Sequence, residues 1–155
     1  CTIFWCQALL WGAANHELSI TMNKHSGSCL CEQIKFEIEG SFDSFYLCHC
    51  KYCQKDTGSA HAANLFSTTA QINWITGQDK IKTFTLPLTR HTKSFCRECG
   101  SAVPSLQLEG KLLAVPAGSL DTKMTLKPDA HLFFSSRAGW DDGLENIKKF
   151  EQFPS

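Results

Sequence analysis

The sequence predicts a mainly β fold: a single domain of short antiparallel strands with little helix. Its 155 residues are enough for one domain with a buried core. Several runs alternate apolar with polar side chains, and glycine, proline or aspartate follows most of them. Apolar residues make up 43% of the chain and charged residues 19%, which is typical of a globular rather than a disordered chain.

The expected strands follow one another with short gaps. The clearest is residues 34–38, where Ile34, Phe36 and Ile38 alternate with Lys35 and Glu37. Further strands are expected at residues 45–47, 72–75, 81–86, 103–108, 112–115 and 131–135. Only residues 141–150 carry a weak helical pattern. No repeat or linker interrupts residues 22–155, so this stretch is interpreted as one domain.

Residues 1–21 are expected to form an N-terminal extension outside the domain. They contain an apolar run from Ile3 to Trp11, far shorter than the ~20 residues that span a bilayer. No basic residue precedes Lys24, whereas a secretory signal begins with positive charge. Met22 opens a stretch that looks like the start of a domain. In the alternative interpretation, the apolar run adds a strand or helix to the core.

The charge balance limits the kinds of partner. Fifteen basic residues match fifteen acidic ones, so the chain has no net field to hold a nucleic-acid backbone or an anionic membrane. We therefore expect neither nucleic acid nor membrane as a partner. A small anion could still bind at a local cluster of cations.

Nine cysteines are many for a chain of this length, and the number is odd. Seven of them lie in clusters with spacings of two or three residues. Such close neighbours rarely form disulfides with each other, because the bridge has strict geometry, but they chelate one metal ion well. We therefore favour thiolates on zinc in a reducing compartment, the cytoplasm, over a disulfide framework in a secreted protein. The predicted domain is thus stapled by zinc.

The seven clustered cysteines divide into four plus three. Four thiolates enclose a structural zinc, whereas three leave one position open for chemistry. One division pairs the two C-x-x-C elements, Cys50/Cys53 with Cys96/Cys99. The other joins Cys29/Cys31 with Cys96/Cys99 and keeps together a second group: Cys48, Cys50 and Cys53. We prefer the second division, because three ligands from one six-residue segment can wrap a single ion.

Three histidines accompany these cysteines. His49 lies between two predicted ligands, and in an extended segment its side chain points away from them. We expect structural roles for His49 and His131, and for His61 an ordinary, partly buried position near the pocket.

The combined pattern resembles the glutathione-dependent formaldehyde-activating family, which is grouped with the centromere protein V domain. The resemblance covers about residues 22–154. It is carried by Gly27-Ser28-Cys29-Leu30-Cys31, by Cys48-His49-Cys50 with Cys53 and Gly58-Ser59-Ala60, by Cys96-x-x-Cys99-Gly100-Ser101, and by Gly118-Ser119-Leu120-Asp121. One departure is Glu32, where the family usually has glycine.

The resemblance implies a β fold with two zinc ions per chain. Carried over by position, the structural zinc would be held by Cys29, Cys31, Cys96 and Cys99. The catalytic zinc would be held by Cys48, Cys50 and Cys53. Glutathione would be the co-substrate, and its two carboxylates need cations. Lys51 and Lys55 beside the open zinc are the best candidates among Lys51, Lys55, Arg90, Lys93, Arg97 and Arg137.

The expected function is that of a carbon–sulfur lyase that joins a thiol to an aldehyde, similar to S-(hydroxymethyl)glutathione synthase. Three thiolates make zinc a weak Lewis acid, but they leave room for a thiol as fourth ligand. Two alternatives stay open: a non-catalytic zinc module, and a redox sensor whose cysteines release zinc on oxidation.

Overall fold

Strand β2 (Lys35–Glu39) shows how the alternating sequence becomes structure. In the computed structural model, which describes residues 23–154, Phe36 and Ile38 are fully buried and Lys35 is exposed. Their side chains point to opposite faces because successive residues of a strand alternate. The expected extension at residues 1–21 lies outside the described residues.

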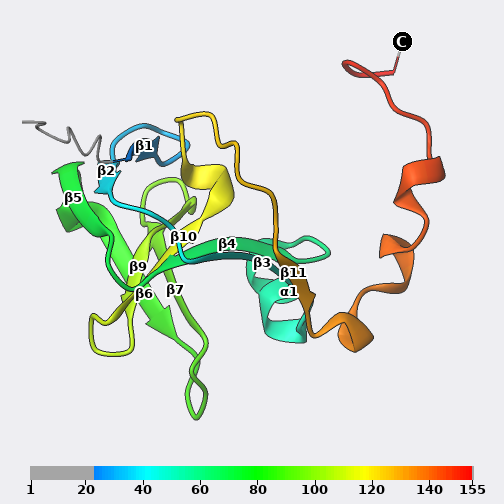
Figure 1. Cartoon of the computed structure of the whole chain (residues 1–155), viewed down its shortest axis with the longest axis horizontal. Helices are drawn as coiled ribbons and strands as arrows, with labels where there is room; N and C mark the ends of the chain where they lie inside the picture. Colours follow the sequence, from blue (N-terminus) through cyan, green and yellow to red (C-terminus); the bar gives the residue numbers. More distant parts are fainter. Residues whose placement is uncertain (1–22, 155) are drawn as a thin grey trace, which may run out of the picture.

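The strands form three sheets (Figure 1). The first has the order β1-β2-β5, with β1 (Lys24–Ser28) and β5 (Gln71–Thr76) on either side of β2. The second has the order β11-β3-β4-β10-β9, formed by β11 (Ala130–Leu132), β3 (Ser44–Cys48), β4 (Ala62–Ser67), β10 (Leu112–Pro116) and β9 (Ser105–Gln107). The third is β6-β7-β8, formed by β6 (Ile81–Thr85), β7 (Thr92–Cys96) and β8 (Ala102–Val103).

The pairing is antiparallel with one exception. β11 runs parallel to β3, with His131 opposite Leu47, and so returns the end of the chain to the strand that carries Cys48. The mainly β, antiparallel prediction is therefore confirmed. The one α-helix of the described residues, α1 (Lys51–Thr57), lies at the end of the second sheet where β11 and β3 pair (Figure 1).

Several boundaries differ from the prediction. Pro104 divides the expected strand 103–108 into β8 and β9, because proline has no N–H for a ladder. The strand expected at 131–135 ends at Leu132, where Phe133 turns to a φ of 52°. The helical pattern of residues 141–150 was wrong: Gly143, with a φ of 68°, interrupts it, and only short 3₁₀ turns form. The 3₁₀ turns are η1 (Gln78–Lys80), η2 (Ala117–Ser119), η3 (Phe134–Ser136), η4 (Gly139–Asp141) and η5 (Leu144–Asn146).

Two clusters of buried side chains form the core. The larger joins the first and second sheets through Phe36, Ile38, Leu65, Leu113 and Val115. The smaller consists of Cys29, Ile34, Cys96 and Val103. Trp74 packs against both clusters. Two cysteines therefore belong to the core itself.

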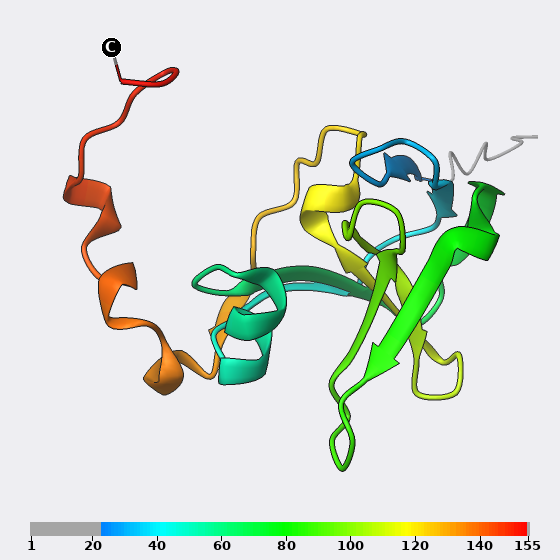
Figure 2. The same cartoon turned by 180° about the vertical axis from the view of Figure 1, so that it is seen from behind.

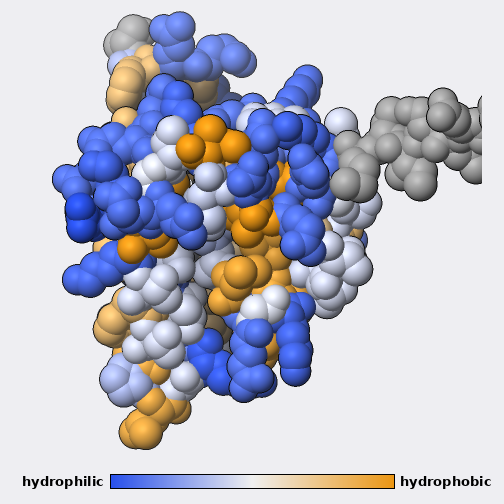
Figure 3. Space-filling model, turned by 90° about the vertical axis from the view of Figure 1, so that its left-hand side faces the viewer, coloured by the Kyte–Doolittle hydropathy of each residue, from blue (hydrophilic) through white to orange (hydrophobic). Residues whose placement is uncertain are grey.

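The chain beyond β11 leaves the body of the domain. From η3 onward it extends past α1 and then away from the sheets (Figures 1 and 2). Apolar side chains remain exposed along it, namely Trp140, Ile147, Phe150 and Phe153. The face drawn in Figure 3 is largely hydrophilic, with a central strip of apolar side chains. Among the described residues, no helix is long and apolar enough to cross a membrane.

Candidate functional site

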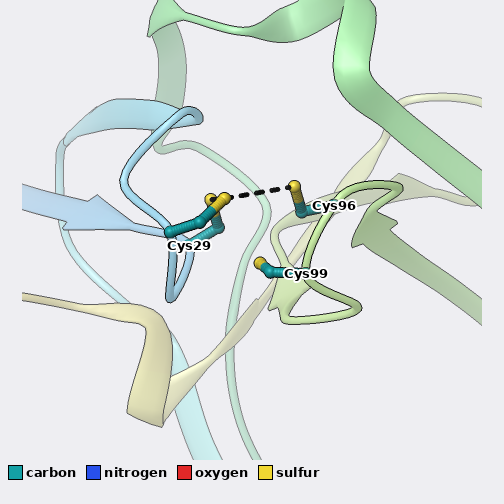
Figure 4. A group of neighbouring side chains, drawn as sticks. Cys29, Cys96 and Cys99 are labelled. Atoms are coloured by element: carbon teal, nitrogen blue, oxygen red, sulfur yellow. Dashed lines mark hydrogen bonds between the residues drawn. The ribbon is translucent and has the colours of Figure 1, made fainter.

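Four cysteines converge between two turns of the chain. Cys29 and Cys31 follow β1, whereas Cys96 ends β7 and Cys99 lies in the next turn. Their four sulfur atoms all lie within 4.8 Å of one another, and the labelled side chains point to a common centre (Figure 4). The distance from Cys31 Sγ is 3.5 Å to Cys29 Sγ and 3.9 Å to Cys96 Sγ.

This geometry fits a tetrahedral zinc ion. With bonds of 2.3 Å, sulfurs on such an ion are about 3.8 Å apart. The backbone also favours thiolates: the N–H of Ser101 lowers the pKa of Cys99 to about 6. Cys29 and Cys96 are fully buried in the core, whereas Cys31 is exposed, so a metal here would have four protein ligands, as in structural sites, at the edge of the core. That zinc binds these residues stays a prediction.

Both turns of this group have left-handed residues. Gly100, with a φ of 75°, closes the second turn, and its N–H donates to the carbonyl of Cys96 at 2.8 Å. Glu32, with a φ of 58°, holds the corresponding conformation in the first turn, and its N–H donates to the carbonyl of Cys29. The departure at Glu32 therefore places a side chain where glycine is favoured, without removing a ligand.

The second group of cysteines surrounds the start of α1. Cys48 ends β3, Cys50 is the N-cap of α1, and Cys53 lies in its first turn. Their sulfurs lie within 4.8 Å of one another, and all three side chains are half-buried. The structure thus gathers the same four-plus-three groups that the resemblance implies, while their metal occupancy stays a prediction.

The position of Cys50 at the start of α1 favours its thiolate form. Burial raises the pKa of Cys50, but hydrogen bonds from the backbone N–H of Cys53 and from neighbouring thiols outweigh it, and the net shift is downward. The N–H of Cys53 lies 3.4 Å from Cys50 Sγ. Backbone N–H groups at a helix start favour an anion in this way.

The second group opens onto a cavity of about 180 Å³. Cys48 and Cys53 line it together with Arg90 and His91. Asp56, Thr92 and Asn64 connect it with two further cavities, of about 250 and 390 Å³, along α1, β4 and β7. These three cavities share lining residues, and together they are called the recess beside the three cysteines.

The two lysines expected to bind glutathione lie at different places. Lys55 is exposed and lines the 250 Å³ cavity, one step from the cysteines. Lys51 is exposed, donates to Gln54 Oε1 at 3.4 Å, and lines none of these three cavities. Arg90 is the cation in the cavity of Cys48 and Cys53. Its position depends on the β6–β7 hairpin, which spacing alone does not reveal.

Three ionisable side chains beside the same recess contact one another. His91 Nε2 lies 3.4 Å from Asp56 Oδ2, and Lys93 Nζ lies 2.6 Å from Asp56 Oδ1. Lys93 is therefore already paired, whereas Arg90 has no ion pair within residues 23–154. No sequence motif contains His91, so sequence reasoning could not identify it as a site residue.

Three histidines pack together on the other side of Cys48 and Cys50. His49 is buried, and its Nε2 lies 2.8 Å from His131 Nδ1. The His61 ring lies 5.1 Å from the His49 ring. Burial lowers the pKa of His49, and the neighbouring His61 lowers it further. His49 is therefore neutral at neutral pH.

Comparison with known proteins agrees with this arrangement. A family model described as glutathione-dependent formaldehyde-activating enzyme matches residues 24–136. A crystal structure of a Rhodobacter sphaeroides protein shares 19% identity and a TM-score of 0.52, over 68% of this chain and 98% of that one. At this identity the likeness shows the fold alone. Since the family model covers well over half of the sequence, the chain belongs to the glutathione-dependent formaldehyde-activating enzyme family.

Proposed function

We propose that this chain catalyses the reversible addition of glutathione to an aldehyde, with formaldehyde as the first substrate to test. The addition forms a bond between the thiol sulfur and the carbonyl carbon. The π electrons of the carbonyl become a lone pair on oxygen, and that oxygen receives the proton lost by the thiol. The reverse reaction breaks the carbon–sulfur bond, so the enzyme would be a carbon–sulfur lyase similar to S-(hydroxymethyl)glutathione synthase.

The opening of the three-cysteine group onto a cavity carries this proposal. Cys48 and Cys53 line that cavity, and three protein thiolates leave one tetrahedral position free. A zinc ion held by Cys48, Cys50 and Cys53 would supply a place where an incoming thiol is favoured as thiolate. The four-cysteine group has no free position, so we assign it the structural zinc.

Arg90 supports glutathione as the thiol. Arg90 lines the cysteine cavity, and a guanidinium can bind a carboxylate through two parallel hydrogen bonds. Lys55 in the adjoining cavity is placed to meet the second carboxylate of the tripeptide. We keep Lys51 only as an outer cation, because it lines none of the three cavities of the recess.

His91 supports the proton transfer. It lines the cavity of Cys48 and Cys53, and an imidazole titrates closest to neutral pH of the ordinary side chains. The Asp56 carboxylate, 3.4 Å from His91 Nε2, would orient the ring. We propose that His91 delivers the proton to the aldehyde oxygen and recovers it in the reverse direction.

Exchange spectroscopy by NMR tests the proposal. The zinc-loaded protein should accelerate exchange between glutathione plus formaldehyde and their hemithioacetal, and Cys50→Ser should abolish the acceleration. Arg90→Ala should raise KM for glutathione roughly tenfold or more, since a charge-assisted hydrogen bond contributes about 1.5–3 kcal/mol. Lys82→Ala, which removes an exposed cation outside the three cavities of the recess, is the matched control.

A thiol without carboxylates makes the test specific. With 2-mercaptoethanol, Arg90→Ala and the parent protein should have equal KM values. No acceleration with any pair of thiol and aldehyde would reject the enzyme and leave the zinc module or the redox sensor. X-ray absorption at the zinc edge completes the test: added thiol should change the coordination of zinc in the enzyme and leave it unchanged in a zinc module.

A further inference from the structure

His49, His61 and Asp141 form a third group whose ligand atoms all lie within 4.8 Å of one another. They come from three separate segments: the turn between β3 and α1, the residue before β4, and η4. Asp141 lies beyond residues 24–136, which the family model matches. None of its three residues belongs to either cysteine group.

The ring nitrogens of this group lack the partners that burial requires. His49 is 1% exposed, and its Nδ1 makes no hydrogen bond although Asp141 Oδ2 lies 3.3 Å away. His61 Nδ1 is also buried without a partner among the described residues. Buried polar atoms in folded proteins are nearly always satisfied by a hydrogen bond, a water or an ion. Two unpartnered nitrogens beside a carboxylate need such an explanation.

We propose that His49, His61 and Asp141 bind a divalent first-row transition-metal ion, with Zn²⁺ as the natural probe. Two imidazoles and one carboxylate are a common set of three zinc ligands, and a water would complete the tetrahedron. On such an ion, with bonds of 2.0–2.1 Å, ligand atoms are about 3.3 Å apart. The separation between His49 Nδ1 and Asp141 Oδ2 has this value.

The surroundings suit a metal-bound His49. When His49 Nδ1 faces the ion, its Nε2 carries the hydrogen and donates to His131 Nδ1 at 2.8 Å. A metal-bound histidine usually donates its second ring N–H to a fixed acceptor in this way. Arg137, the nearby cation, has its charge balanced by Asp142, with both carboxylate oxygens 3.0 Å from Nη2.

Such an ion would fasten the C-terminal segment to the catalytic end of the domain. Phe134 packs edge-on against His49, and the Arg137 guanidinium lies 4.4 Å above the Phe134 ring. Metal binding by Asp141 would add a further attachment between this stretch and His49. The result would be a fixed wall behind the loop that carries Cys48 and Cys50.

Titration with Co²⁺ of the metal-free, reduced protein tests the proposal. Cobalt on thiolates gives strong sulfur-to-metal charge-transfer bands, whereas a site of two imidazoles and a carboxylate gives only weaker d–d bands. We expect a third equivalent of cobalt without charge transfer. This equivalent should be lost in Asp141→Asn and in His61→Ala, and it should bind roughly 10–100-fold more weakly in His131→Ala.

Matched controls separate loss of the site from loss of the fold. His25→Ala removes another imidazole whose Nδ1 is buried without a partner and that belongs to no ligand group of the described residues, and it should keep all three equivalents. The thiolate bands should persist in every variant, which shows that the domain is intact. Saturation at two equivalents in the parent protein, or a third equivalent that survives both Asp141→Asn and His61→Ala, would overturn the proposal.

Discussion

Replacing Cys96 by serine should destabilise the domain more than replacing Cys50. Cys31 and Cys96 are 65 residues apart, whereas Cys48 and Cys53 are five positions apart. A zinc ion that joined Cys31 to Cys96 would close a longer loop than one that joined Cys48 to Cys53. The entropic cost of closing a loop in the unfolded chain rises by ~0.6 kcal/mol for each doubling of its length. Between three and four doublings separate the two loops, which gives a difference of about 2 kcal/mol.

Burial increases this difference. Cys96 is fully buried beside Ile34 and Val103, so the introduced hydroxyl would cost a further ~1–3 kcal/mol, while Cys50 is half-buried. The expected gap is therefore about 3–5 kcal/mol, or roughly 6–20 °C in Tm for a chain of this size. Thermal melts followed by circular dichroism, with zinc in excess, measure it. Equal melting temperatures, or a lower value for Cys50→Ser, would refute the reasoning.

Three further predictions concern single positions. Gly27→Ala should cost about 1–3 kcal/mol in urea melts, because the new Cβ would lie 2.5 Å from the Ser119 carbonyl oxygen and still closer to the Phe36 ring. Gly118→Ala, with open space around its Cβ, is the control, and equal losses would contradict the clash. Glu32→Gly should raise stability by up to about 1 kcal/mol, since glycine relieves the left-handed backbone; a loss of stability would refute it. The N–H and hydroxyl of Thr68 lower the pKa of Asp43 below 3.8, so this carboxylate stabilises the fold above that pH and loses its effect as pH falls through the folded-state pKa. Asp43→Asn should therefore make the free energy of unfolding fall less steeply as the pH is lowered, and an unchanged slope would refute the prediction.

The strands with clear alternation were predictable from sequence. β2 follows the period of two almost to the residue, because its apolar side chains lie on one face. β6 was predicted close to its observed bounds, although Ile81 and Phe84 lie on opposite faces. β4, with the sequence Ala-Ala-Asn-Leu-Phe-Ser, has no such period and was missed. The seven-residue helix α1 was missed as well, since its Cys50 N-cap and left-handed Gly58 C-cap lie inside a stretch that was interpreted only as a metal-binding motif.

The candidate site was predictable as far as its ligands are neighbours in sequence. Spacing identified the cysteine clusters, but it could not decide which cluster Cys96 and Cys99 join, because that depends on where β7 meets the turn after β1. Arg90 and His91 enter the cavity through the β6–β7 hairpin, which no local pattern predicts. His49 and Asp141 meet only because β11 pairs with β3 and directs η4 over the loop.

The parallel pairing of β11 with β3 also matters while the protein is being made. β3 lies between β4 and β11, and β11 is the last of the described strands to leave the ribosome. Until residues 130–132 emerge, one edge of β3 has unpaired backbone groups next to Cys48, and an open edge invites pairing with another chain. A nascent or truncated chain that stops short of β11 would therefore aggregate through the strand that leads to the reactive thiols.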